Sequence, residues 1–185
     1  MQGVICINGT KIRNIVYSAL FAAIICIATV IVRIPVPATK GYINLGDCFV
    51  IISGAVLGPL YGFLASALGS ALSDIINGAA YFVPATIIIK GVMALAVSLI
   101  YGKTGRKKFS LLLSGIIAEI IMTAGYLVYE AFVLGYKSAA VAELPMNAIQ
   151  GAAGIILSFI LLTAISKNTK LREIFLTGGN GNEHI

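Results

Sequence analysis

The placement of positive charges relative to apolar runs constrains this chain more than any other feature. Six apolar stretches can be marked, at roughly 12–33, 46–61, 62–78, 84–101, 109–135 and 144–166. Each approaches the length of about 17–25 residues that a membrane-spanning helix needs. The sequence therefore predicts an all-α integral membrane protein with six transmembrane helices.

The Lys and Arg residues, 13 in all, are distributed unevenly between the segments that connect these stretches. The inner segments, which are cytoplasmic if both termini are cytoplasmic, hold Lys11, Arg13, Lys103, Arg106, Lys107, Lys108, Lys167, Lys170 and Arg172. The outer segments hold only Arg33, Lys40 and Lys137, and Lys90 lies inside a predicted helix. Cytoplasmic loops of membrane proteins carry an excess of Lys and Arg, so this asymmetry predicts cytoplasmic termini and a cell-membrane location.

Composition agrees with a membrane protein. Charged residues make up 11% of the chain, about half the fraction of a typical soluble domain. The apolar runs are continuous rather than alternating, which favours helices over a transmembrane barrel. We divide the chain into a leader at 1–11, a membrane domain at 12–166 and a cytoplasmic tail at 167–185. The net charge of +6 follows from topology and does not indicate nucleic-acid binding.

Prolines and glycines predict where the helices begin and end. An outer loop is expected at 35–45, where Pro35 and Pro37 exclude further helix. Gly58-Pro59 predicts a tight inner turn between the second and third helices. The last outer loop is expected at 137–144, with Pro145 opening the sixth helix.

A polar face runs through the predicted helices. Ionisable residues inside membrane helices are costly and mark candidate functional sites. Here they are Asp47, Asp74, Lys90, Glu119 and Glu130. Glu119, Tyr126 and Glu130 share one stripe of the fifth helix, and Asn147 and Gln150 share a face of the sixth. Most of these residues lie in the outer halves of their helices, at about 1.5 Å of rise per residue. They predict a pocket open to the outside, in which Tyr126 could stack on a planar ring.

Simpler interpretations of single residues stay open. Lys90 could form a structural ion pair with Glu119 or Glu130. Asp47 is expected to cap the second helix rather than contact a ligand. Gly102-Lys103-Thr104 resembles the end of a phosphate loop, but the required earlier glycine is Val97. No catalytic, metal or cofactor motif is found, so a non-catalytic protein is expected.

Three segments carry a family resemblance. They are Gly41-Tyr42-Ile43-Asn44-Leu45-Gly46-Asp47, then Gly58-Pro59-Leu60-Tyr61-Gly62, then Pro84-Ala85-Thr86 leading to Lys90-Gly91. In order and spacing they resemble the substrate-binding (S) components of energy-coupling factor (ECF) vitamin transporters, in the riboflavin, hydroxymethylpyrimidine and pyridoxine group. The similarity covers about residues 12–166. It implies a subunit that binds one water-soluble vitamin or precursor from outside. Delivery would then require a transmembrane coupling protein (EcfT-type) and two cytoplasmic ATPases (EcfA-type).

The resemblance also implies roles for individual residues. The docking motif of the first helix corresponds to Ala19 and Ala23. The gating loop corresponds to 35–45 and includes Tyr42 and Asn44. The substrate pocket, chosen mainly from the polar stripes, comprises Lys90, Glu119, Tyr126, Glu130, Asn147 and Gln150.

Three functions are compared. The leading hypothesis is a vitamin-binding S component for a pyrimidine, pyridine or flavin ring, with the modest number of pocket aromatics favouring the smaller rings. The second is a self-sufficient proton-coupled transporter that uses Glu119 as the proton carrier. The third is an intramembrane enzyme or scaffold, which would have to act without transport partners.

Overall fold

The computed structural model describes residues 9–36, 39 and 41–172. Residues 1–8 of the predicted leader, 173–185 of the predicted tail and Lys40 lie outside the described residues. Within these ranges, 5 helices are long and apolar enough to cross a membrane. The long helices are α1 (Gly9–Ile31), α2 (Gly46–Ile76), α3 (Val83–Lys103), α4 (Lys108–Val128) and α5 (Ser138–Lys167). The short elements are β1 (Arg33–Val36), β2 (Gly41–Asn44), the 3₁₀ turn η1 (Ala80–Phe82), the π-helical turn η2 (Tyr129–Val133) and α6 (Thr169–Arg172).

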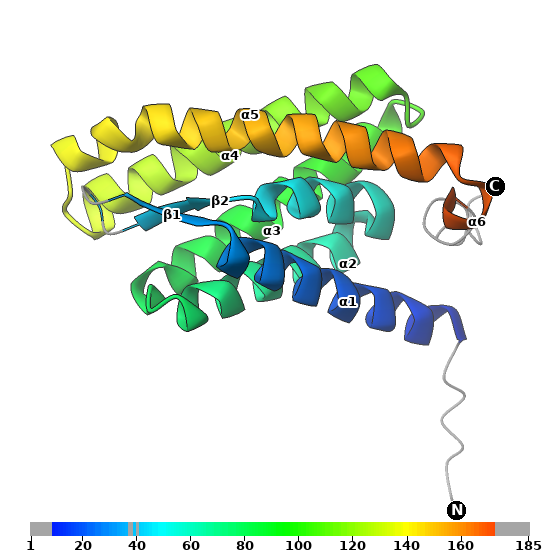
Figure 1. Cartoon of the computed structure of the whole chain (residues 1–185), viewed down its shortest axis with the longest axis horizontal. Helices are drawn as coiled ribbons and strands as arrows, with labels where there is room; N and C mark the ends of the chain where they lie inside the picture. The colour runs from blue at the N-terminus through cyan, green and yellow to red at the C-terminus, as the bar shows by residue number, and fades with distance from the viewer. Residues whose placement is uncertain (1–8, 37–38, 40, 173–185) are drawn as a thin grey trace, which may run out of the picture.

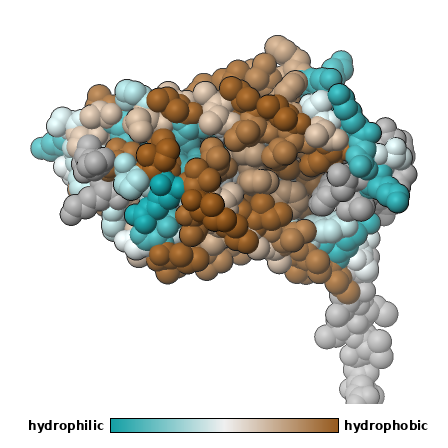
Figure 2. All heavy atoms as spheres, in the orientation of Figure 1, coloured by the Kyte–Doolittle hydropathy of each residue, from teal (hydrophilic) through white to brown (hydrophobic). Residues whose placement is uncertain are grey.

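The long helices form a bundle with two polar ends and an apolar middle. One end holds the start of α1, the α3–α4 connection and the end of α5 (Figure 1). The strands and the α4–α5 connection lie at the other end. Figure 2 shows a brown apolar belt between the two hydrophilic ends. Leu20, Leu68, Ile120 and Ile156 are among the exposed apolar side chains. A belt of this kind is what the hydrocarbon of a bilayer would cover.

The stretches predicted as the second and third helices are a single element, α2, with a reversal inside it. Gly58 is non-helical, at φ 80° and ψ −179°, and Pro59 follows it. The hydroxyl oxygens of Ser53 and Ser66 are 2.8 Å apart, whereas thirteen residues of straight helix would separate them by about 20 Å. The chain therefore folds back at the predicted turn. Six separate spanning helices are not found, because the two limbs are joined through this reversal.

Close approach of small residues fixes α1 against α2. A Cβ added to Gly69 would lie 2.5 Å from the Ala22 carbonyl oxygen, so only glycine allows this spacing. Ser18 Oγ donates a hydrogen bond to the Tyr61 carbonyl at 2.8 Å. The Ser18–Ala22 face of α1 is thereby directed inward. Ala19 and Ala23 are exposed and lie about 100° around the helix from Ser18 and Ala22.

The expectation of a wholly helical chain is wrong at the predicted gating loop. β1 and β2 pair antiparallel, with Arg33 opposite Asn44 and Pro35 opposite Tyr42. Pro35 has no N–H to donate, but an edge strand of a two-stranded ribbon tolerates this loss. The segment is therefore a hairpin rather than an irregular loop, and its backbone hydrogen bonds hold it in shape.

The predicted last outer loop is also wrong. α5 begins at Ser138 and carries Pro145 in its interior. Alanine is the strongest helix former, and 138–142 contains three alanines. Pro145 removes one backbone hydrogen bond and is tolerated there, as happens in membrane helices whose neighbours satisfy the freed group. The helix therefore gains about two turns at its start, and these turns bring Glu143 into the bundle.

Candidate functional site

A cavity opens at the end of the bundle that carries the strand hairpin. The space inside it is about 490 Å³, a figure that includes a part open to solvent. Polar side chains dominate its wall. The lining residues are Thr29, Tyr42, Asn44, Ser70, Ser73, Asp74, Phe82, Thr86, Lys90, Tyr126, Glu130, Glu143, Asn147 and Gln150.

The structure brings together most of the residues selected from the sequence. Those that line the cavity are Tyr42, Asn44, Lys90, Tyr126, Glu130, Asn147 and Gln150. Glu119 is not among the lining residues. Its carboxylate lies against Gly151 and Gly154 of α5, where an added Cβ would come within 3.1 Å and 3.0 Å of its oxygens, tighter than an ordinary contact. Glu119 is therefore buried behind the cavity wall.

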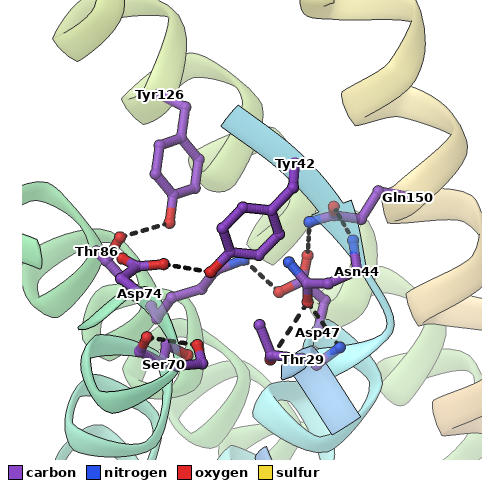
Figure 3. Close-up of polar contacts among 12 residues, drawn as sticks. Thr29, Tyr42, Asn44, Asp47, Ser70, Asp74, Thr86, Tyr126 and Gln150 are labelled. Carbon is purple, nitrogen blue, oxygen red and sulfur yellow. Dashed lines mark hydrogen bonds and ion pairs between the residues drawn. The ribbon is translucent and has the colours of Figure 1, made fainter. Parts of the chain in front are cut away.

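Asp47 is the centre of the polar network at the base of the cavity. Its Oδ1 forms an ion pair with Lys90 Nζ, and its Oδ2 accepts a hydrogen bond from Gln150 Nε2 at 2.5 Å. Gln150 Oε1 in turn accepts from the backbone N–H of Asn44 at 2.7 Å. This network ties α2, α3, α5 and β2 together (Figure 3).

The network corrects two predictions. Lys90 pairs with Asp47, and no ion pair with Glu119 or Glu130 is found within the described residues. Asp47 does not cap α2, because the N-cap position is Leu45 and no side-chain cap bond is made. Asp47 and Lys90 are 1% and 4% exposed. A charge this deeply buried needs a partner, and each supplies the other.

Tyr126 occupies the position predicted from its helical stripe. Its hydroxyl lies 3.0 Å from Thr86 Oγ1, and Lys90 Nζ lies 5.5 Å from the centre of its ring. Phe82 packs edge-on against it, with 6.0 Å between ring centres. Figure 3 shows the Tyr126 side chain directed from α4 toward Thr86. The ring is thus held on two sides and forms a fixed aromatic part of the wall.

The β hairpin covers one side of the cavity and is held there by Tyr42. The Tyr42 hydroxyl donates a hydrogen bond to Asp74 Oδ1 at 2.5 Å, and the guanidinium of Arg33 lies 5.2 Å from the centre of the tyrosine ring. Burial raises the pKa of the Tyr42 phenol above its usual value, and the charge of Asp74 raises this pKa further. The hydroxyl therefore keeps its proton well into the alkaline range and remains the donor.

Sequence reasoning missed Glu143 and assigned no ligand-facing role to Asp47 or Asp74. Glu143 is 3% exposed and lines the cavity. It precedes Asn147 by four residues and Gln150 by seven, so it belongs to their helical stripe. The prediction that this helix begins at Pro145 left Glu143 outside the helix and so hid the signal. Within the described ranges, no group of three or more His, Cys, Asp or Glu side chains could hold a metal ion.

An apolar helical bundle with one polar cavity at one end is the architecture of a membrane-embedded protein that binds a small molecule. Comparison with known proteins defines the class further. The model of the family "ECF-type riboflavin transporter, S component" matches residues 9–167. The chain belongs to this family, and it is therefore a membrane transport subunit of the ECF type rather than an enzyme.

Two further proteins are similar to this chain. A protein of Pyrococcus woesei, described as "Uncharacterized protein in gap 3'region", is 36% identical over 133 residues, which is 72% of this chain and 88% of that protein. A solved structure described as "Structure and mechanism of the S component of a bacterial ECF transporter" has a TM-score of 0.71 at 22% identity. The match covers 85% of this chain and 97% of that chain, and it establishes the shared fold.

Proposed function

We propose that this protein is the specificity subunit of an ECF importer, which binds a water-soluble vitamin or vitamin precursor with a planar ring. The observation that carries the proposal is the cavity at the hairpin end, with hydrogen-bonding groups from six elements (α1, β2, α2, α3, η2 and α5) around the Tyr126 ring. The family description makes riboflavin the first ligand to test, followed by pyrimidine and pyridine vitamins.

Delivery of the ligand would depend on partners. We propose that a transmembrane coupling protein and two cytoplasmic ATPases complete the importer, as the family assignment implies. The exposed face of α1 that carries Ala19 and Ala23 supports a docking role, because small residues let another helix approach closely in a membrane. Ser18 and Ala22 pack against α2, and Ala19 and Ala23 beside them stay exposed to a partner.

The proposed topology has both termini in the cytoplasm and the cavity facing outward. The α2 reversal supports it, because a helix that turns back brings α3 to start on the same side as α2. The two limbs of α2 would then serve as the second and third of six membrane segments. The basic residues at 103–108 would lie on the cytoplasmic side, as the positive-inside rule requires.

The experiment that tests the function has two parts. The protein is purified alone in mild detergent, and bound small molecules are identified by mass spectrometry. Riboflavin, a pyrimidine precursor and pyridoxine are then titrated against ligand-free protein by calorimetry. Binding of one vitamin with a stoichiometry of one and a submicromolar dissociation constant is expected. Failure of every vitamin-type ligand in both parts would reject the proposal.

The proton-coupled transporter remains the second candidate because of one observation. Both carboxylate oxygens of Glu119 are buried without a hydrogen-bond partner in the described structure. A buried group of this kind could carry a proton across a membrane. Liposomes containing the protein alone separate the two candidates. Uptake driven by a proton gradient would favour the transporter, whereas uptake only with the coupling protein, the ATPases and ATP supports the S component.

A further inference from the structure

The acidic residues of this chain are concentrated in its interior. Five of the 7 Asp and Glu residues lie in the described ranges, and all are buried, with exposures between 1% and 6%. Asp74, Glu130 and Glu143 line the cavity, whereas Asp47 and Glu119 lie behind its wall. Burying a carboxyl group costs free energy unless it is paired or hydrogen-bonded. The three that line the cavity therefore need a compensating partner.

The protein compensates these three groups only in part. Tyr42 donates to one oxygen of Asp74, and the Thr86 hydroxyl also lies at hydrogen-bonding range of this carboxyl group. The carboxyl groups of Glu130 and Glu143 lie at hydrogen-bonding range of each other. The other oxygens, Asp74 Oδ2, Glu130 Oε2 and Glu143 Oε2, are buried without a hydrogen-bond partner in the described ranges. Each of these acceptors belongs to a side chain that is more than nine-tenths buried and lines the cavity.

The cationic side chains near the cavity already interact with other groups of the protein. Lys90 is the one cationic side chain among the lining residues, and its ammonium group is paired with Asp47. Arg33 is exposed at the rim and lies over the Tyr42 ring. Two carboxyl groups at hydrogen-bonding range can share a single proton. Among the lining residues, no further cationic side chain is left for these three carboxyl groups.

The two glutamates reach the wall from different elements of the fold. Glu130 lies in the π-helical turn η2, where α4 widens at its end. Glu143 lies in the turns of α5 that precede Pro145. π-Helical turns are frequent at functional sites. Two separate elements thus deliver carboxyl groups to one wall, which we call the acidic wall and define as Asp74, Glu130 and Glu143.

We propose that the ligand carries a basic nitrogen, as in an amine or an aminopyrimidine, and binds it against the acidic wall, with no phosphate or carboxylate of its own. This inference rests on the proposed function and narrows its ligand class. A protonated or strongly N–H-donating group would pair with the carboxyl groups of this wall, which have no free cation among the lining residues. A phosphorylated vitamin would place like charges together in a site shielded from water.

The test uses pairs of probes that differ in one group. Pyridoxamine is compared with pyridoxine, and 4-amino-5-hydroxymethyl-2-methylpyrimidine with its 4-oxo analogue, by calorimetry on the full chain in nanodiscs. The amino member of at least one pair should bind at least about tenfold more tightly, since hydrogen bonds to charged groups are strong. Glu130→Gln and Glu143→Gln should each remove most of that preference.

Controls separate this inference from a general effect of losing a buried carboxyl group. Glu119→Gln changes an equally buried acid outside the cavity lining and should keep the preference. Thermal unfolding of each ligand-free variant identifies any that fail to fold, and Asp74→Asn then provides another test of the wall. Absence of the preference, or failure of all amino probes to bind, would overturn the inference.

Riboflavin and its 5′-phosphate distinguish failure of this inference from failure of the proposed function. Tight binding of neutral riboflavin that is unchanged in Glu130→Gln and Glu143→Gln would reject the basic-nitrogen ligand while leaving a vitamin-binding subunit intact. Binding of the phosphate as tightly as riboflavin would likewise reject an acidic wall that selects against anions. Loss of the proposed function itself would appear as failure to support ATP-dependent uptake with the coupling complex.

Discussion

A single residue, Asp47, organises the base of the cavity. It connects a lysine 43 positions away with a glutamine 103 positions away. Residue type and helical spacing were enough to select Lys90, Tyr126 and Gln150 from the sequence, because polar side chains in a membrane helix must face one another. Spacing within a helix carries no information about partners on other helices, so the pairing of Lys90 with Asp47 could not be predicted.

The ion pair gives a first prediction. Lys90→Met should destabilise the protein by about 3–5 kcal/mol, because it leaves the buried Asp47 carboxylate without its cation. Adding Asp47→Asn to Lys90→Met should recover a large part of this loss, because no charge then remains unpaired. Unfolding free energies in detergent, measured as a double-mutant cycle, check both changes. Additive losses would contradict direct coupling between the two residues.

The Tyr42 hydroxyl gives a second prediction. Tyr42→Phe keeps the ring beneath Arg33 but removes the hydrogen bond to Asp74, so the hairpin should open more easily. Ligand dissociation is expected to accelerate by about tenfold, the kinetic equivalent of losing a hydrogen bond to a charged group. Stopped-flow release measures this rate. Tyr129→Phe is the matched control, because that hydroxyl donates to the Tyr81 carbonyl and does not line the cavity. Equal ligand dissociation rates in the two variants would contradict a role for the Tyr42 hydroxyl in holding the hairpin closed.

At the scale of secondary structure, breaks in helices were harder to predict than helices. The apolar runs located all of the long helices, since only helices satisfy the backbone in lipid. Gly58-Pro59 was correctly predicted as a turn, although both limbs belong to one element. Pro145 was misinterpreted as a helix start. The local sequence does not distinguish a proline in the first turn of a helix from a tolerated proline in its interior. Packing between helices decides which occurs.

The reversal in α2 gives a third prediction. Gly58→Ala should cost about 1–3 kcal/mol, because φ near +80° with extended ψ is accessible almost only to glycine. Gly102→Ala is the control, since a Cβ there meets nothing within 4 Å and the backbone φ is not positive. Titration with a denaturing detergent compares the two variants. Similar midpoints would show that the reversal does not depend on this conformation.

The outer face of α1 gives a fourth prediction. Ala19→Leu together with Ala23→Leu should prevent assembly with the coupling protein but leave vitamin affinity unchanged, because both residues are exposed and away from the cavity. Ala148→Leu with Ala152→Leu is the control, since these alanines are exposed on α5 at the same spacing. Co-purification and calorimetry provide the two readouts. Normal assembly of the α1 double variant would contradict docking at this face.

At the scale of the whole molecule, the charge pattern and the reversal of α2 together predict topology. If α2 turns back, the start of α1 and the α3–α4 connection lie on one side, and the α4–α5 connection lies on the other. If α2 crossed the membrane once, the start of α1 and the α3–α4 connection would lie on opposite sides. The two cases therefore differ at sites that are far apart in the sequence and accessible to reagents.

Cysteine labelling tests this fifth prediction without removing any charge. Gly9→Cys, Thr104→Cys and Ser138→Cys are introduced singly into a background without the native cysteines. In intact cells a membrane-impermeant maleimide should label only the Ser138 variant, whereas broken cells should show labelling of all three. Labelling of the Thr104 variant in intact cells would indicate a single crossing by α2.

The burial of every acidic residue in the described ranges has a consequence for the exterior of the protein. The ionised side chains that meet water or lipid headgroups across these ranges are all Lys and Arg. Among the described residues, acidification therefore neutralises no exposed carboxylate, and the positive charge that these residues contribute should stay nearly constant from about pH 4 to pH 9. Anionic lipids such as phosphatidylglycerol or cardiolipin should therefore attract the basic residues at 103–108 equally over this whole pH range.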